Sequence, residues 1–343
     1  LGISVAVTTS TTNTSATLGG DVTTTNGDVK VDATTDIAKN SSAAEAATLG
    51  NPNTLSAKMT NFTAGIQRNV GSSILGATGL VSSGTASKIT DFMFPGIKEG
   101  KFNAAGAVSY TDSENNASAS IAAGASVKAH GKVDVVSLIN DRPSASADAK
   151  ATSTGTAIGG SVVIANFLNN SDAWIGDLAE VDARGAIRVD AQTHIPYPWQ
   201  IDWSSPAVIL NHLQGNLLDL VLTTFALNSA SGKSGVGLAA AVTVFTLENN
   251  SNAWVGEGAK LNTIYDNAVD AALDLSGQSV TVYAKNDVNT VNAAGILSKK
   301  FLGSGGGKAA IGGSANVLTV SGEAVAGIRD GADVRAEQDV EVK

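Results

Sequence analysis

The stretch GGSVVIANFLNNSDAWIGDLAEVDARGAIRVDA, residues 159–191, decides the fold, because its order of residues returns later in the chain. From Leu238 the chain reads LAAAVTVFTLENNSNAWVGEGAKLNT. In both stretches an alternating apolar run leads to Asn-Asn-Ser, at 169–171 and 249–251, and then to Ala-Trp-Ile/Val-Gly. A short unit that recurs in this way indicates stacked structural repeats, since one unit alone cannot bury its apolar face.

Three weaker copies share the same frame. They span Gly2–Ala33, Ala105–Val136 and Ile311–Val342. Runs such as Val162–Ile164 and Ile187–Val189 place apolar residues at every second position, which is typical of a strand with one buried face. Glycine and asparagine separate these runs, so each copy is expected to be a set of several short strands.

The composition favours a solenoid over a β-sandwich. The 343 residues include 37 Gly, and aromatic residues make up only 5%. Inward-facing Ala, Val and Gly suit a narrow interior. The sequence therefore predicts an all-β fold, a parallel β-helix or β-solenoid with short α-helical insertions. It is expected to be right-handed, as parallel crossovers generally are.

The repeats and the stretches between them give five regions. Solenoid repeats are expected at 1–40, 102–192 and 235–343, the last with loop insertions. Helical insertions are expected at 41–101 and 193–234. Apolar residues recur at helical spacing in both insertions: Leu55, Met59, Phe62, Ile66, Val70 and Ile74 in the first, and Leu210, Leu213, Leu217, Val221 and Phe225 in the second. None of the six prolines is expected inside a strand, since proline cannot donate to the ladder.

The composition also excludes several functional classes. The chain has no Cys, so disulfide frameworks, thiol catalysis and cysteine metal sites are excluded. A formal net charge of -9 argues against nucleic acid and anionic membranes as partners. No apolar run reaches the roughly 20 residues of a bilayer span, so no membrane insertion of this segment is expected. The chain opens and closes inside strand-like patterns, and we expect it to be a segment of a longer protein.

The asparagine pairs are the first candidate positions. Asn169 and Asn170 in one copy match Asn249 and Asn250 in another. Stacked in register, they would form an asparagine ladder in which each side-chain amide bonds to its equivalent one coil away. Alternatively, asparagine is present because it tolerates the left-handed conformation of a turn. The sequence leaves both interpretations open, and both are structural.

Trp174 and Trp254 are the second pair of candidate positions. They occupy equivalent places in two copies, each next to an apolar residue, Ile175 or Val255, that is expected to point inward. Alternation then places both indole rings on the outside. Exposed there, they could stack on sugar rings or contact another chain. The alternative is that the insertions cover them.

At this point the repeats resemble those of very large bacterial surface proteins, the filamentous-haemagglutinin-type and leukotoxin-type filamentous adhesins. The shared pattern is a glycine-alanine-rich strand, an asparagine turn, an alanine-aromatic-isoleucine-glycine strand and a closing G-x-V-x-V-x-A strand. The resemblance covers about two thirds of the chain and implies a parallel β-helix, export to the cell exterior and an adhesive or structural role. It carries no catalytic residues with it.

Motifs for chemistry are missing from the sequence. The three histidines, His130, His194 and His212, have no ligand spacing, and neither a nucleophile elbow nor a phosphate-binding loop occurs. No cofactor is expected; calcium is left open, without a motif to support it. Candidate acid–base residues such as Asp134, Asp141 and Arg142 are expected near a turn. We therefore expect a protein that is not an enzyme.

The expected function is that of a structural, adhesive rod at the bacterial cell surface or outside the cell. Its expected partners are other cells, matrix, polysaccharide or like chains, and a homo-oligomer or filament is left open. A carbohydrate-active β-helix, either a polysaccharide lyase or a hydrolase, is the first alternative. A self-assembling filament subunit is the second.

Overall fold

The computed structural model describes residues 1–48, 102–197, 223–232, 235–264, 275–296, 304–306 and 309–343. All regular elements among these residues are β-strands. The predicted helices at Leu55–Ile74 and Leu210–Val221 lie outside the described residues.

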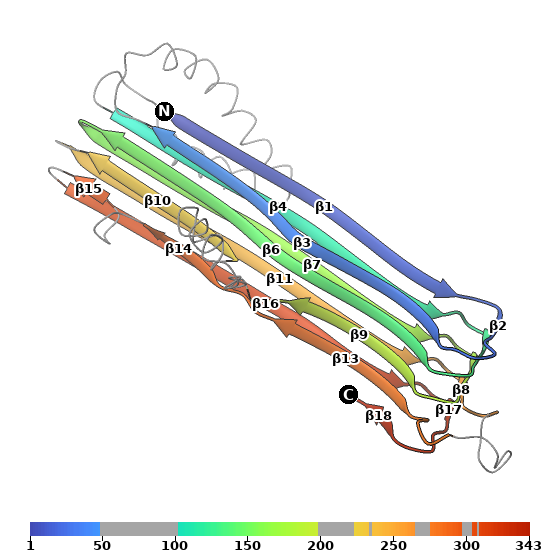
Figure 1. Ribbon diagram of the computed structural model, residues 1–343. Coiled ribbons are helices and arrows are strands. Elements are labelled where there is room, and N and C mark those ends of the chain that lie inside the picture. Colours follow the sequence, from blue (N-terminus) through green and yellow to red (C-terminus); the bar gives the residue numbers. More distant parts are fainter. Residues whose placement is uncertain (49–101, 198–222, 233–234, 265–274, 297–303, 307–308) are drawn as a thin grey trace, which may run out of the picture.

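The described chain winds through five coils, which Figure 1 shows side by side. Each coil begins with one long strand, turns through one short strand and returns along a second long strand or its pieces. The coils contain β1 (Gly2–Leu18), β2 (Asp21–Thr23) and β3 (Val29–Thr48); β4 (Phe102–Ile121), β5 (Ser126–Ala129) and β6 (Val133–Ser153); β7 (Thr156–Ile175), β8 (Glu180–Ala183), β9 (Ile187–Ile195) and β10 (Thr224–Gly232); β11 (Val236–Val255), β12 (Lys260–Leu261), β13 (Val280–Val288), β14 (Asn292–Ile296) and β15 (Ser304–Gly306); and β16 (Ala309–Ile328), β17 (Asp333–Val334) and β18 (Val340–Val342).

Three parallel sheets result from this winding. The front sheet has the order β1-β4-β7-β11-β16, and the corner sheet has the order β2-β5-β8-β12-β17. The back sheet contains β3, β6, β9, β10, β13, β14, β15 and β18. Every strand pair is parallel. The prediction of an all-β parallel β-solenoid is confirmed, while the right-handed sense stays an expectation from the crossover rule.

The repeat copies stack in the frame that their sequences indicate. In the front sheet Asn169 pairs with Asn249, and Trp174 pairs with Trp254. The weaker copies join the same register, since Asn115 pairs with Asn169 and Gly2 pairs with Ala105. The side chains of one repeat position therefore form a column that runs from coil to coil.

The strands are much longer than the alternating runs predict. β7 and β11 each have 20 residues, and β6 has 21. The prediction of several short strands broken at asparagine was wrong. Asn169 and Asn170 lie within β7, where their amides bond along the columns, so the backbone has no reason to turn there.

Three boundaries of the predicted insertions also move, since β9 continues to Ile195. β3 continues to Thr48, and β10 occupies residues that the helical pattern places in the second insertion. Ala44 and Ala46 are buried at every second position, and Phe225, expected on a helix face, is a strand residue that is 4% exposed. Alanine-rich segments can form a helix or a strand. In both places the segment pairs in parallel with β6 and is therefore a strand.

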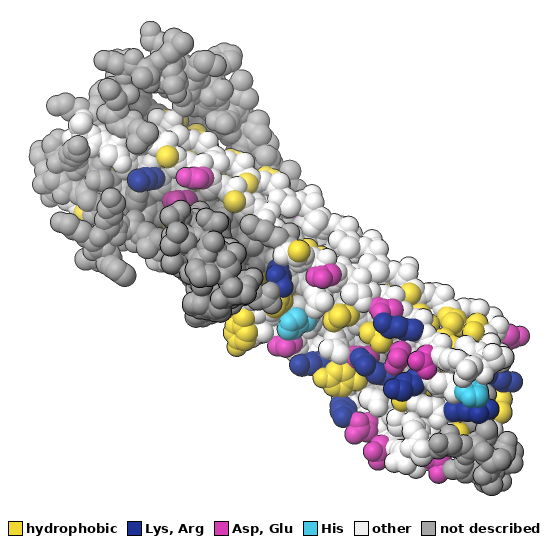
Figure 2. Space-filling model, in the orientation of Figure 1, with side chains coloured by type: hydrophobic (Ala, Val, Ile, Leu, Met, Phe, Trp, Pro, Cys, Tyr) yellow, Lys and Arg dark blue, Asp and Glu magenta, His cyan; other side chains and the backbone are white. Residues whose placement is uncertain are grey.

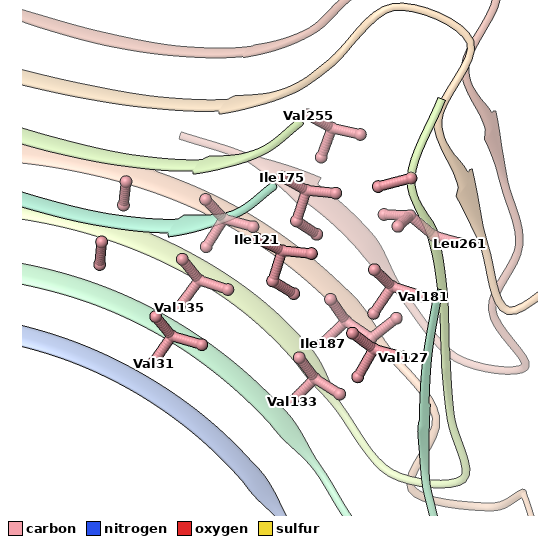
Figure 3. Packing of buried hydrophobic residues seen from close by; sticks show 14 of the residues in the cluster. Val31, Ile121, Val127, Val133, Val135, Ile175, Val181, Ile187, Val255 and Leu261 are labelled. Carbon is pink, nitrogen blue, oxygen red and sulfur yellow. The ribbon is translucent and has the colours of Figure 1, made fainter. Parts of the chain in front are cut away.

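Two apolar clusters fill the interior. The cluster at the corner sheet combines residues from all three sheets: Ile121, Ile175 and Val255 point toward Val133 and Ile187 of the back sheet and toward Val127, Val181 and Leu261 of the corner sheet (Figure 3). The second cluster lies between the front and back sheets farther along the strands, and includes Phe167, Phe245 and Leu247. Small residues dominate both clusters, as the narrow interior requires.

The close approach of neighbouring coils at the corner explains the glycine of the Ala-Trp-Ile/Val-Gly motif. A Cβ at Gly176 would lie 2.4 Å from the backbone nitrogen of Ala123, and one at Gly256 would lie 2.5 Å from that of Asp177. Coils thus approach too closely there for any side chain. Two residues further, Leu178 has a φ of 57° and Gly258 a φ of 64°, so the corner turns through the left-handed region.

Candidate interaction surface and side-chain ladders

An inner asparagine ladder runs through three coils. Asn115 Nδ2 donates to Asn169 Oδ1 at 2.7 Å, and Asn169 Nδ2 donates to Asn249 Oδ1 at 2.8 Å. All three side chains have no exposed surface. A buried amide is costly unless it is bonded, and the stacked register gives each amide at least one ladder bond. Asn115 Oδ1 and Asn249 Nδ2, at the two ends of the ladder, have no hydrogen-bond partner. Of the two interpretations, the structure shows the ladder and not the turn.

A second ladder runs along the outer surface of the same strands. Asn250 Nδ2 donates to Asn170 Oδ1 at 3.0 Å, Asn170 Nδ2 to Asn116 Oδ1 at 2.9 Å, and Asn116 Nδ2 to Asn13 Oδ1 at 3.0 Å. Successive residues of a strand point to opposite faces. An Asn-Asn pair therefore places one amide inside and one outside, and the two ladders share the same coils.

The inner ladder ends where the fifth coil has a glycine. Gly322 is the partner of Asn249, and a Cβ there would lie 2.6 Å from the Asn249 carbonyl oxygen and 3.1 Å from Asn286 Nδ2. Asn286 reaches across from β13 and donates to the carbonyl oxygens of Asn249 and Glu323, at 2.8 and 2.9 Å. The side chain of the back sheet thus takes the space that a further ladder residue would need.

The two candidate tryptophans form a stack. The rings of Trp174 and Trp254 are 5.0 Å apart between centroids, with 3° between their planes. The Arg329 guanidinium carbon lies 5.1 Å from the Trp254 ring centroid, a cation–π contact. Ile175 and Val255 are fully buried, so the rings lie on the outside as alternation predicts. Trp254 meets Trp174 and Arg329, and these contacts explain the pair as a link between coils.

The outer surface of the front sheet is acidic and otherwise uncharged. Its five strands contain no Lys, Arg or His. They contain five carboxylates: Asp112, Glu114, Asp172, Glu248 and Glu323. Figure 2 shows Lys and Arg side chains gathered with Asp and Glu over the part of the molecule where β9, β13 and β18 lie. The two long faces of the solenoid therefore differ in charge.

Two outward apolar columns cross the front sheet. The first joins Val5, Val108, Val162, Val242 and Ala315, and the second joins Val7, Tyr110, Ile164, Val244 and Val317. Within the second, Tyr110, Ile164 and Val244 pack together with Val162. Val5, Val7 and Val317 are 42%, 44% and 50% exposed at the two ends of the columns. Ile311 and Val325, at outward positions of β16, are 61% and 44% exposed and add to the apolar surface that these valines present.

The charged side chains of the back and corner sheets pair with one another. Lys30 pairs with Asp32, and Arg188 with Asp190. Across coils, Lys260 Nζ lies 2.8 Å from Glu180 Oε1, and His194 Nδ1 lies 3.3 Å from Asp287 Oδ2. His130 Nε2 lies 3.3 Å from Arg184, and His212 lies outside the described residues. Both kinds of pair occur on these sheets, within one strand at spacing i, i+2 and between neighbouring coils.

The remaining predicted chemistry residues are separated by the sheet. Asp134, Asp141 and Arg142 all lie within β6. Asp134 follows the bend at 130–131 closely, whereas Asp141 and Arg142 lie in the middle of the strand, so their expected place near a turn was wrong. Asp141 points into the interior with no exposed surface, whereas Arg142 is exposed on the other face. Among the described residues, no group of three His, Asp or Glu side chains could hold a metal ion.

Comparison of the chain with protein-family models, with curated proteins and with solved structures finds no match. Within the described residues, no helix has the length and apolar character needed to cross a membrane.

Proposed function

We propose that this chain is a structural, adhesive segment of a large secreted or surface-anchored bacterial protein, of the filamentous-haemagglutinin or leukotoxin-type adhesin kind. The observation that supports this proposal most directly is that the repeated residues contact one another between coils. The asparagine and tryptophan positions that recur most clearly bond from coil to coil, at Asn169–Asn249 and Trp174–Trp254. Recurrence that serves stacking supports a scaffold, since a scaffold must repeat its contacts in every coil.

The outer surface supports a role in contact with other cells, matrix or like chains. The front sheet presents Val5, Val7 and Val317 beside carboxylates and the outer asparagine ladder. Apolar and amide groups side by side suit broad, shallow contact better than recognition of one small ligand. The absence of cysteine is compatible with a bacterial surface or extracellular location.

Adhesion by an intact rod is testable with a pair of glycine variants. The chain is displayed on a non-adherent bacterium, and cell clumping and attachment to matrix-coated surfaces are measured. We expect display to increase both. Gly176→Ala, which forces a Cβ onto the neighbouring coil, should lose the gain, whereas Gly277→Ala, where a Cβ meets nothing within 4 Å, should keep it. Equal adhesion by displayed and empty cells would refute the proposal.

The carbohydrate-active alternative predicts cleavage of polysaccharide, which can be measured with purified chain. Purified chain is incubated with neutral and uronic-acid polysaccharides, and new reducing ends and unsaturated uronates are measured. A signal that His194→Ala abolishes would favour a lyase, since His194 with Asp287 is a histidine–carboxylate contact on the described surface. Electron microscopy of the same sample tests the second alternative, because a filament subunit would form end-to-end assemblies.

A further inference from the structure

A polar layer separates the two apolar clusters of the interior. Its front-sheet side chains are Ser113, Asn115 and Asn169, all buried. Opposite them lies Asp141 of β6, which has no exposed surface. Asn115 Nδ2 is 3.4 Å from Asp141 Oδ2, a long contact, and Asp141 Oδ1 and Asn115 Oδ1 have no hydrogen-bond partner. A carboxylate is thus enclosed by neutral amides, with one oxygen unsatisfied.

The back sheet is irregular at this same level in three coils. β3 has a register shift between Ile37 and Asn40, opposite Asp141 and Pro143. In the third coil β9 pairs with β6 as far as Asn140, and β10 resumes at Ala145. In the fourth coil β13 ends at Val288 and β14 begins at Asn292. Pro143 lies inside β6, contrary to the sequence expectation, at a point where the ladder is already interrupted.

Among the side chains that the structure describes, no charged group faces Asp141. The inward residues at its level are Thr35 and Asn40 of β3, Ser113 and Asn115 of β4, Asn169 of β7 and Thr193 of β9. Among the described side chains of the neighbouring strands, the titratable or charged residues closest in register are Asp36, Arg142 and His194, and all three occupy outward positions. A negative charge on Asp141 therefore has no compensating cation among the described side chains, and burial favours the protonated acid.

We propose that the polar layer around Asp141 is a proton-controlled joint between the two halves of the solenoid. When Asp141 is protonated, the layer is closed and both apolar clusters act as one body. When Asp141 is ionised, the layer admits water and the interrupted back sheet opens locally, while the continuous front sheet holds the halves together.

The direction of the pH effect follows from burial. Loss of hydration raises the pKa of Asp141 from 3.8 to about 6, against smaller opposing effects of hydrogen bonds from Asn169, Asn40 and the Arg142 backbone. A carboxyl whose pKa is higher in the folded than in the unfolded chain stabilises the fold at low pH. That stabilisation is lost as the pH rises through about 6. The folding equilibrium constant is then expected to be about tenfold larger at pH ~5 than at pH ~8 through this group alone.

Asp141→Asn removes the proton site and keeps the shape of the side chain. Denaturant unfolding of the whole chain is measured at both pH values, together with hydrogen exchange corrected for intrinsic rates. In the wild type we expect amides of 109–117 and 138–146 to lose protection at the higher pH, and in Asp141→Asn to lose none of it. Asp134→Asn, which removes an outward carboxylate from the same strand, should behave as the wild type.

Two results would overturn the proposal of a proton-controlled joint. One is an unchanged pH response of these amides in Asp141→Asn; the other is a wild-type response spread evenly over all coils. If Asp141→Asn does not fold, the wild-type exchange pattern still decides, because a loss confined to the polar layer supports the proposal and a uniform loss contradicts it.

Discussion

Trp174 and Trp254 lie 80 residues apart in the chain and stack with 3° between their ring planes. Parallel stacking at this separation follows from the solenoid itself, because equivalent side chains of neighbouring coils are separated by about 4.8 Å, the spacing of hydrogen-bonded strands. The geometry of the two rings therefore reports the register between β7 and β11.

A double-mutant cycle on this pair should measure its coupling. Trp174→Ala and Trp254→Ala are each expected to lower the free energy of unfolding, and their coupling energy should be about 0.5–1.5 kcal/mol. Denaturant unfolding measures the energies, and near-ultraviolet circular dichroism should lose the signal of the stacked indoles in either single variant. Additive energies would show that the rings do not interact in solution.

The inner ladder should be far more sensitive than the outer one. Asn169→Ala leaves Asn115 Nδ2 and Asn249 Oδ1 without their ladder partners in the interior, which should cost about 2–5 kcal/mol of unfolding free energy. Asn170→Ala breaks the same number of ladder bonds at a half-exposed position, where water replaces them, and should cost about 1 kcal/mol or less. Equal losses in the two variants would contradict the inner and outer assignment.

The corner glycines should tolerate no side chain. Gly176→Ala places a Cβ 2.4 Å from the Ala123 backbone nitrogen, so the coils must separate, and we expect a loss of about 2 kcal/mol or more. Gly277→Ala meets nothing within 4 Å and should change stability by about 1 kcal/mol at most. Thermal unfolding of both variants measures the difference. A Gly176→Ala protein as stable as the wild type would contradict the close approach.

Phe167 should anchor the second apolar cluster. Its ring centroid lies 5.6 Å from that of Phe245 in the next coil, and the side chain is 2% exposed. Phe167→Ala should lower the unfolding free energy by about 3–5 kcal/mol, since it leaves a cavity that the sheets cannot close. Leu168→Ala, one residue further on the outward face, is the control and should lose clearly less. Equal losses of unfolding free energy in Phe167→Ala and Leu168→Ala would contradict the placement of Phe167 in the core.

The sequence was sufficient to predict the fold class and the register of the columns. Matching Asn169 with Asn249 and Trp174 with Trp254 needs only the repeat, and the structure pairs both. The sequence does not predict the strand length, because asparagine between apolar runs is also typical of a turn. A buried amide within a strand is stable only if its neighbour in the next coil is also an amide, and that condition is visible in a stack and not in one copy.

Several important residues carry no signal in the repeat. Arg329 contacts Trp254, and Asn286 fills the space beside Gly322, yet neither position recurs among the copies. Asp141 resembles any surface carboxylate in sequence, next to an arginine. Side chains alternate between the two faces of a strand, and this alternation places Asp141 on the same face as Ile139 and Ala145. The sequence signal for the burial of Asp141 is therefore its spacing from these apolar residues.

The length of the strands has a mechanical consequence. A strand of 20 residues spans roughly 65 Å, whereas two stacked sheets lie about 10 Å apart, so the coil is roughly six times wider than it is thick. The bending stiffness of a beam grows with the cube of its depth in the bending direction. A solenoid of this section should flex as a tape does, easily across its flat faces and hardly at all in its own plane. Such a shape can follow a curved surface while it resists shear in its own plane.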